Sequence, residues 1–574
     1  GSSPRARAGR SAGLLALASL VLAGCATSPR ATPADLVLLG GKVVTVDPEL
    51  GEARAVAMGG GRILAVGSDA EVRAHVGPDT EVIDLEGRLA IPGFIEGHGH
   101  LTGIGAYKLN LELMDLASWD EVLELVAAAA AEAEPGTWIV GRGWHQEKWD
   151  RLPTPSVEGF PTHAALSAVS PDHPVLLRHA SGHASFVNAR ALELAGIDGT
   201  TAPPHGGEIL HDADGEPTGL LRETAQALVS RVHAAAEQRT PAEQRAHLRH
   251  LVRLAEAECL SKGITSFQDA GSSFATVDVL RELAEAGELD LRLWVMLRGT
   301  NEELAELLSA YRMVGVGDHY LTVRAVKVSM DGALGARGAW LLEPYSDLPS
   351  STGLNLVPPD QVAETARLCD AAGFQLCIHA IGDRANREVL DIYAATHDPA
   401  VDRRWRIEHA QHLHPDEVPR FAELDVIASM QGVHCTSDAP YVPARLGHER
   451  AEEGAYVWRS LRDAGVVVTN GTDAPVEDVS PIASYHATIS RRLPDGSRFY
   501  PDQRLGRMEA LETYTIDCAF AAFEEHLKGS LTPGKLADVV VLDRDILTCP
   551  EDEVPGARVL YTIVGGEVRY RSEG

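Results

Sequence analysis

The chain has 574 residues, which is too many for one small hydrophobic core and predicts a large domain with a smaller one, or two to four domains. Its apolar fraction of 45% and charged fraction of 23% are typical of a globular protein. The formal net charge of −31 argues against nucleic-acid binding and against docking on anionic lipid through charge.

Residues 1–25 have the pattern of a secretory signal. Three arginines precede the apolar run SAGLLALASLVLAG, which is too short to span a bilayer as a mature helix. The run ends in LAGC, which resembles a bacterial lipobox, so we expect Cys25 to be lipidated. The protein would then be an exported lipoprotein, facing the periplasm or the cell exterior, that touches the membrane only through this anchor. The alternative is plain secretion with cleavage near ATSPRATPA. Residues 26–35 are expected to be a tether.

Short β-rich runs with glycine turns occur at both ends of the remaining chain. The first end contains DLVLLGGKVVTVD, AVAMGGGRILAVG and EVIDLEGRLAI, and the other contains ADVVVLDRDI and ARVLYTIVGGEVRYR. The two ends share one texture and flank a long middle segment. We therefore expect residues 36–92 and 525–574 to form one composite β-sandwich.

The middle of the chain, residues 93–524, alternates short apolar runs with helical patterns such as VDVLRELAEAGE and PDQVAETARLCDAAG. Eight β-runs separated by helices predict an α/β fold, a (β/α)8 TIM-like barrel. The runs are LAIPGFIEGHGH, GITSFQDAG, LRLWVMLRG, LTVRAVKVSMDG, FQLCIHAIGD, RWRIEHAQH, DVIASMQGVH and GVVVTNGTDAP.

A long stretch, residues about 110–260, interrupts this alternation between the first two barrel runs. It is far too long for one connection between a strand and a helix. We interpret it as an inserted subdomain that covers the barrel mouth. Six cysteines follow residue 25, none in a C-x-x-C pair, and we interpret them mostly as small buried hydrophobic residues.

Polar side chains stand where the barrel strands should end. His98 and His100 end the first run, and residues two apart in an extended chain point to the same side. Alone, this pair fits a polar loop as well as a metal site. Lys327, His379 and Asp473 end later strands, as does His409. Because barrel active sites form at the carboxyl ends of the strands, the six residues together predict a metal centre.

The residue types suit hydrolysis. Imidazole and carboxylate bind zinc-like ions, and manganese, cobalt or iron would fit similar ligands. Two ions need more ligands than three residues provide, and a lysine carboxylated by carbon dioxide becomes a carbamate that can bridge them. A hydroxide between two cations has a lowered pKa and attacks at neutral pH. Asp473 can take its proton and pass it to the leaving group.

The chain resembles the metal-dependent amidohydrolase superfamily, specifically the YtcJ-like branch that includes N-substituted formamide deformylases. The resemblance rests on PGFIEGHGH, GITSFQDAG, VKVSMDGALG, IHAIGD, RIEHAQ, GTDAPV and GSLTPGKLADVVVLDRD, with RHASGHASFVNARAL and GGEI in the insert. It implies two divalent ions, expected to be zinc, with these ligands: His98 and His100 for one ion, His379 and His409 for the other, carboxylated Lys327 as the bridge, and Asp473 as ligand and general acid–base.

The sequence departs from the branch at two positions. Glu96 stands where relatives often have Asp, and Gly432 stands where they tend to have Pro, next to His434. The insert motifs supply further candidates whose alternative role is structural. The candidate substrate contacts are His434, Trp144, Arg178, His183 and Asn188.

The leading interpretation is an exported hydrolase that cleaves an amide-type carbon–nitrogen bond of a small molecule. A deaminase is an alternative, but it usually works with one metal in this superfamily, which leaves Lys327 without a bridging role. An esterase, lactonase or phosphotriesterase on the same scaffold is another, and an inactive binding lipoprotein is the non-enzyme alternative. Arg337, Arg491 and Arg492 could pair with a substrate carboxylate, although surface arginines are commoner. No pattern predicts an oligomeric state.

Overall fold

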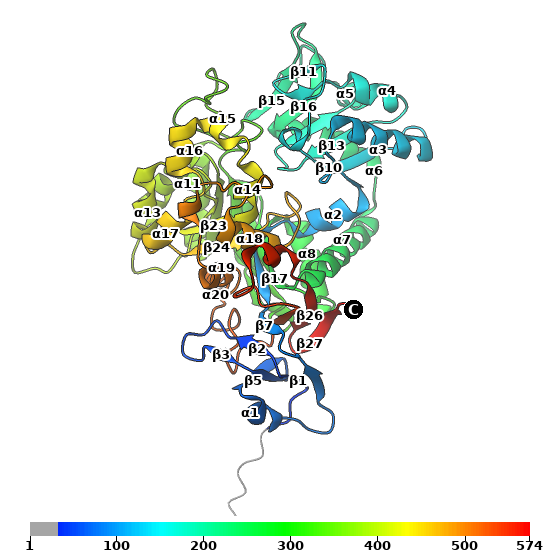
Figure 1. Ribbon diagram of the computed structural model, residues 1–574. Helices are drawn as coiled ribbons and strands as arrows, with labels where there is room; N and C mark the ends of the chain where they lie inside the picture. Colours follow the sequence, from blue (N-terminus) through cyan, green and yellow to red (C-terminus); the bar gives the residue numbers. More distant parts are fainter. Residues whose placement is uncertain (1–31, 574) are drawn as a thin grey trace, which may run out of the picture.

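A parallel barrel forms the centre of the molecule in the computed structural model, which describes residues 32–573 (Figure 1). The order along the sheet is β8-β17-β18-β20-β21-β22-β23-β24, and β19 (Met313–Gly315) pairs with β20. The strand bounds are Phe94–Gly99, Ile264–Ser272, Arg292–Leu297, Leu321–Ser329, Gln375–Ala380, Arg406–His409, Ile427–Gln431 and Val468–Gly471. The predicted (β/α)8 barrel is confirmed, and each of the eight predicted runs covers all or nearly all of one barrel strand.

Helices connect the strands and cover the outside of the barrel (Figure 1). Apolar residues at helical spacing face the sheet: in α8, for example, Val277, Leu280 and Leu283 are buried while the opposite side is polar. The larger covering helices are α2 (Leu101–Leu109), α7 (Pro241–Ser261), α8 (Phe274–Ala286), α9 (Asn301–Tyr311), α11 (Pro359–Ala372), α12 (Asp383–Thr396), α18 (Pro481–Ser490) and α19 (Arg507–Thr513).

The barrel closes between β8 and β24. The backbone N–H of Asp473 donates to the carbonyl of His98 at 2.8 Å, which joins the last strand to the first. A Cβ atom on Gly97 would lie 2.3 Å from the carbonyl oxygen of Asn470, so a larger residue could not occupy this position without moving a strand. The close approach brings the ends of β8 and β24 together at the barrel mouth.

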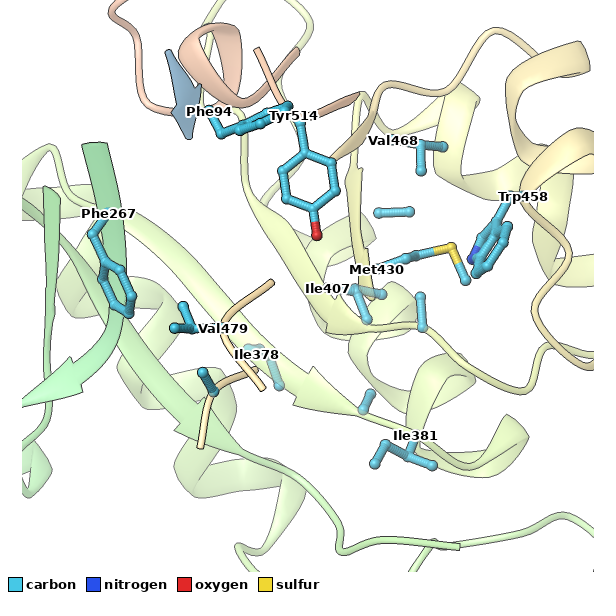
Figure 2. Packing of buried hydrophobic residues seen from close by; sticks show 14 of the residues in the cluster. Phe94, Phe267, Ile378, Ile381, Ile407, Met430, Trp458, Val468, Val479 and Tyr514 are labelled. Atoms are coloured by element: carbon cyan, nitrogen blue, oxygen red, sulfur yellow. The ribbon is translucent and has the colours of Figure 1, made fainter. Parts of the chain in front are cut away.

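Aromatic packing supports this closure from outside the barrel. Figure 2 shows the ring of Tyr514 beside Phe94, with the centroids 6.0 Å apart at 76°. The Tyr514 hydroxyl donates to the carbonyl of Gly471 at 3.0 Å. Further round the barrel, Met430 of β23 points toward Trp458 of α17 (Trp458–Asp463) in the same cluster (Figure 2). The core is therefore continuous from strands to helices.

Both ends of the described chain build the β-sandwich below the barrel (Figure 1). One sheet has the order β5-β4-β1-β6 and the other β27-β26-β25-β7-β2-β3. The bounds of β1 to β7 are Leu36–Leu39, Lys42–Val44, Glu52–Ala53, Ala55–Gly59, Arg62–Gly67, Glu81–Asp84 and Leu89–Pro92, and those of β25 to β27 are Val539–Leu542, Val559–Val564 and Glu567–Arg571. The predicted composite sandwich is confirmed. Arg292 of β18 joins it to the barrel by a buried ion pair with Asp538 at 2.8 Å.

A third sheet lies over the carboxyl ends of the barrel strands (Figure 1). Its order is β15-β16-β14-β13-β10-β9. The bounds of β9, β10, β13, β14, β15 and β16 are, in that order, Leu111–Glu112, Ile139–Trp144, Val175–His179, Ala184–Val187, Gly207–His211 and Pro217–Glu223. The helices of the insert are α3 (Trp119–Glu132), α4 (Ala164–Val169), α5 (Ala189–Ala195) and α6 (Ala227–Glu237). The chain re-enters the barrel layer at α7, which packs on α2, so the range of about 110–260 includes one barrel helix.

Residues 1–31, with Cys25 and most of the expected tether, lie outside the described residues. Within residues 32–573, no helix combines the length and the apolarity needed to cross a membrane. The six cysteines of this range form no disulfide with one another, and all except the half-buried Cys549 are buried.

Candidate metal centre

A recess lies between the barrel mouth and the inserted sheet. Barrel and insert both contribute side chains to its wall. The lining residues are His145, Ala180, Ser181, His183, Ala333, Leu334, His379, Ile381, His409, Gln411, His434, Asp438, Tyr441, Asp473, Val476 and Glu477.

His98 of the first strand and His100, just after it, meet Asp473 after the last strand. The Asp473 Oδ1 atom lies 3.1 Å from His100 Nε2 and 3.5 Å from His98 Nε2. His98, His409 and Asp473 each offer one ligand atom, and these three atoms lie within 4.8 Å of one another. Closure of the barrel thus gathers donors from β8, β22 and the end of β24 around one point.

The other predicted residues adjoin this group. Lys327 Nζ lies 3.4 Å from His98 Nε2. The ring centroid of His409 lies 4.7 Å from that of His98 and 4.5 Å from that of His379. Lys327, His379 and His409 are each no more than 4% exposed. The structure therefore brings all six predicted side chains to one place at the carboxyl ends of five barrel strands.

A buried ion pair orients the first ligand. Arg406 and Glu408 are two residues apart on β22, so both side chains point into the barrel. Arg406 Nε donates to Glu408 Oε1 at 2.7 Å. The other Glu408 oxygen contacts Nδ1 of His98. This contact occupies Nδ1, so Nε2 of His98 faces the site. Likewise, His409 Nδ1 lies 2.7 Å from Gln431 Oε1, which orients the ring of His409.

Burial keeps His98, His379 and His409 neutral. It lowers the pKa of His98 to about 4, and the nearby charge of Lys327 acts in the same direction. It also holds the pKa values of His379 and His409 well below the ordinary value. Burial and then Arg298 lower the pKa of Lys327 to about 8.

Asp473 is an ionised carboxylate. Burial by itself would raise its pKa, but interactions with the imidazoles of His100, His98 and His409 hold that pKa well below its ordinary value. Its backbone, with φ at 57°, and that of His409, at 75°, lie in the left-handed region that non-glycine residues rarely adopt. Such strained residues concentrate at functional sites, where the surrounding structure holds them.

The donor set fits a divalent cation. Neutral imidazoles and an ionised carboxylate are nitrogen and oxygen ligands of the kind that zinc-like ions take. Nε2 of His379 is buried without a hydrogen-bond partner, which is costly for a polar atom unless a ligand occupies it. His98, His100, Lys327, His409 and Asp473 surround the same space.

Two of the five candidate substrate contacts, His183 and His434, line the recess. Trp144 lies in the core of the insert, where Nε1 donates to the carbonyl of Leu177 at 2.9 Å. Asn188 caps α5 by accepting from the N–H of Ala191 at 3.1 Å. Arg178, on β13, is not among the lining residues. The expectation that these three residues contact the substrate is therefore wrong, because their motifs reflect the packing of the inserted sheet.

The departure at Gly432 has a packing cause. A Cβ atom there would lie 2.2 Å from Thr488 Oγ1, so α14 (Gly432–Asp438) can approach α18 only with glycine at this position. His434 still lines the recess, and its Nδ1 lies 3.0 Å from Gln411 Nε2. Two of the three candidate arginines are held by the protein: Arg491 is buried against backbone carbonyls, and Arg337 pairs with Asp347 at 3.1 Å.

Several functional side chains escaped sequence reasoning. Glu408 and Gln411 stand beside His409 in the strand-end motif RIEHAQ. This position could have predicted that they lie at the site. His145 lines the recess directly after β10 of the insert, whereas Asp438 and Tyr441 line it from the end of α14 and just beyond, without any strand-end pattern. Nothing in the local sequence separates them from other polar residues of the insert and the helices.

Comparison with known proteins decides the family. The model of the amidohydrolase family matches residues 81–570. The chain belongs to the amidohydrolase family. It is 35% identical to Protein LONG AFTER FAR-RED 3 of Arabidopsis thaliana, over 95% of this chain and 93% of that protein. It is 30% identical to YtcJ of Bacillus subtilis (92% and 98%) and to the N-substituted formamide deformylase of Arthrobacter pascens (94% and 99%).

A solved structure agrees with this membership. An uncharacterized metal-dependent hydrolase from Pyrococcus horikoshii OT3 superposes with a TM-score of 0.71 at 26% identity, covering 90% of this amidohydrolase chain and 99% of its own. The expected resemblance and the expected barrel are thus both confirmed, and the protein is a metal-dependent hydrolase of the amidohydrolase family that acts on carbon–nitrogen bonds.

The contact from Glu408 to His98 should govern metal affinity. In Glu408→Gln the amide no longer holds Nδ1 of His98 as a carboxylate does, so zinc affinity should fall about 10- to 100-fold, as is common when a residue behind a metal ligand is replaced. Competition with a chromophoric chelator measures this affinity. Glu477→Gln, a change of the recess wall, is the matched control. Equal zinc affinity in Glu408→Gln and the wild type would contradict the role.

Proposed function

We propose that this amidohydrolase cleaves an amide-type carbon–nitrogen bond of a small molecule with the help of two bound divalent cations. The observation that carries the proposal is the convergence of six predicted side chains at the carboxyl ends of five barrel strands. The name of the Arthrobacter pascens relative, an N-substituted formamide deformylase, supports a substrate with an amide bond.

The proposed ligands follow from the positions of the side chains. His98 and His100 would hold one cation, with Asp473, which lies within 3.5 Å of both rings. His379 and His409 would hold the other, and Lys327, carboxylated on Nζ, would bridge the pair. Carboxylation replaces a buried ammonium with an anion beside the cations, which suits its burial. Zinc is the expected metal because imidazoles dominate the set.

The residues have distinct tasks in hydrolysis. Bound cations would supply polarisation of the substrate carbonyl and a water nucleophile that is ionised at neutral pH. The Asp473 carboxylate accepts the proton of the attacking water and passes it to the leaving nitrogen. His100 Nε2 lies 3.1 Å from Asp473 Oδ1, so the ring and the carboxylate face the same point of the site. The insert covers the recess and limits access of bulk water to the reacting bond.

A site with a single cation is the second candidate. His98, His409 and Asp473 alone place three ligand atoms within 4.8 Å of one another, which is enough for one ion. That arrangement would favour a deaminase-like reaction. Mass spectrometry of metal ions per chain, on protein purified without chelator, separates the two: about two ions support the bridged centre and about one supports the alternative.

Lys327→Ala should lower metal content and activity together, because both proposed cations lose their bridge. We expect metal content to fall from about two ions per chain to one or fewer, and turnover of N-formyl and N-acyl amides to fall at least about 100-fold. Lys535→Ala, in the β-sandwich, is the control, since Lys535 contacts Ser530 far from the recess. Wild-type metal content and turnover in Lys327→Ala would show that the lysine is only structural.

Asp473→Asn should impair catalysis more than folding. The amide cannot accept the proton from the attacking water, so kcat should fall about 10²- to 10⁴-fold. The melting temperature should stay within a few degrees of the wild type, because the two side chains have nearly the same shape. Asp398→Asn, on the surface, serves as the control. A variant that turns over normally would remove Asp473 from the mechanism.

We also propose that the protein is exported and lipidated on Cys25. The support is the LAGC motif after an apolar run with basic residues before it. In a bacterial host, Cys25→Ala should abolish labelling by a fatty-acid analogue and move the protein from the membrane fraction to the soluble one. Cys549→Ala should behave as the wild type. A wild-type protein that takes up no label would exclude the anchor.

A further inference from the structure

A histidine of the insert is anchored by a glutamate and turned toward the recess. His183 precedes β14 and Glu223 ends β16, and the two strands pair antiparallel. The backbone N–H of Glu223 donates to the carbonyl of His183 at 2.8 Å, and His183 Nδ1 lies 2.7 Å from Glu223 Oε2. Strand pairing therefore fixes the spacing of the two side chains.

Glu223 is in turn held against the barrel. Its backbone has φ at 50°, and its side chain is almost fully buried. A Cβ atom on Gly332 would lie 2.0 Å from Glu223 Oε1, and one on Gly338 would lie 2.3 Å away. Both glycines follow β20, the strand that carries Lys327. The loop thus leaves room for the Glu223 carboxylate beside the metal centre.

The ring of His183 has one polar atom left for a ligand. An ionised carboxylate only accepts hydrogen bonds, so Nδ1 carries the hydrogen that faces Glu223. In a neutral ring Nε2 then presents a lone pair. The ring lines the recess, and its centroid lies 5.0 Å from that of His379, a proposed metal ligand.

We infer that Nε2 of His183 accepts a hydrogen bond from the N–H of the scissile amide. The inference rests on the proposed amide hydrolysis and narrows its substrate class. Primary and N-monosubstituted amides can donate this hydrogen bond, whereas tertiary amides and esters have no N–H to offer. His183 thereby orients the nitrogen that leaves, and Glu223 is the positioning residue behind it.

The test compares two probes on metal-loaded protein, N-butylformamide and N-butyl-N-methylformamide. The ratio of their kcat/KM values should fall about 10- to 100-fold from wild type to His183→Phe, which keeps a ring and removes the acceptor. His183→Gln, which still offers an oxygen acceptor, should restore part of the ratio. His173→Phe is the control, because His173 is a buried histidine of the insert outside the recess lining.

Two further variants test the positioning without touching His183. Glu223→Gln and Gly332→Ala should each lower the same ratio, and metal content by mass spectrometry should stay at the wild-type value in every variant. An unchanged ratio in His183→Phe, with the wild type active on N-butylformamide, would overturn the role of His183 alone. A wild type with two metal ions and no turnover of either formamide would overturn the proposed formamide-type activity and this inference with it.

Discussion

The site depends on one buried charge in the barrel interior. Arg406 is fully buried and donates to Glu408, to the carbonyl of Gly97 at 2.8 Å and to Ser429 Oγ at 2.6 Å. Burying a guanidinium is costly unless a counter-charge and hydrogen bonds compensate it fully. Compensation here requires β8, β22 and β23 to keep one register, and the same Glu408 carboxylate orients His98. One ion pair therefore both compensates the buried charge of Arg406 and orients His98, a proposed metal ligand.

Closure of the barrel transmits that constraint to the far side of the site. Gly97 lets β24 approach β8. The backbone hydrogen bond from Asp473 to His98 then places the Asp473 carboxylate beside the imidazoles of His98 and His100. Asp473 and His409 both retain unfavourable left-handed backbones in this position. Strain of this kind persists only where the surrounding packing allows no relaxed alternative. The tight seam, sealed by Tyr514, supplies that packing.

The insert completes what the barrel leaves open. Ion pairs join the two parts at the rim, where Lys148 lies 3.1 Å from Glu477 and Arg445 lies 2.6 Å from Glu147. The barrel supplies the proposed metal ligands, whereas the insert supplies part of the wall, including His183. This division agrees with the general behaviour of barrels, in which strands carry the chemistry and loops set the specificity.

The sequence by itself determined the fold class and the chemical types at the strand ends. Each β-run is short, apolar and followed by a polar residue, and parallel strands of a barrel all end at one rim, so His98, His379 and Asp473 were predictable as neighbours. The insert behaved differently. Trp144 and Asn188 stood in motifs as specific as that of His183, yet they pack inside the inserted sheet.

Only the tertiary structure decided which polar residues meet across the chain. Glu408 and His98 are 310 residues apart, and Glu223 and His183 are 40 apart. Local periodicity describes which face of its own element a residue occupies, and it carries no information on the partner of that face. Strand register and closure of the barrel choose that partner. The type of chemistry was therefore predictable from the sequence, and the contacts that orient the candidate residues came from the packing of distant segments.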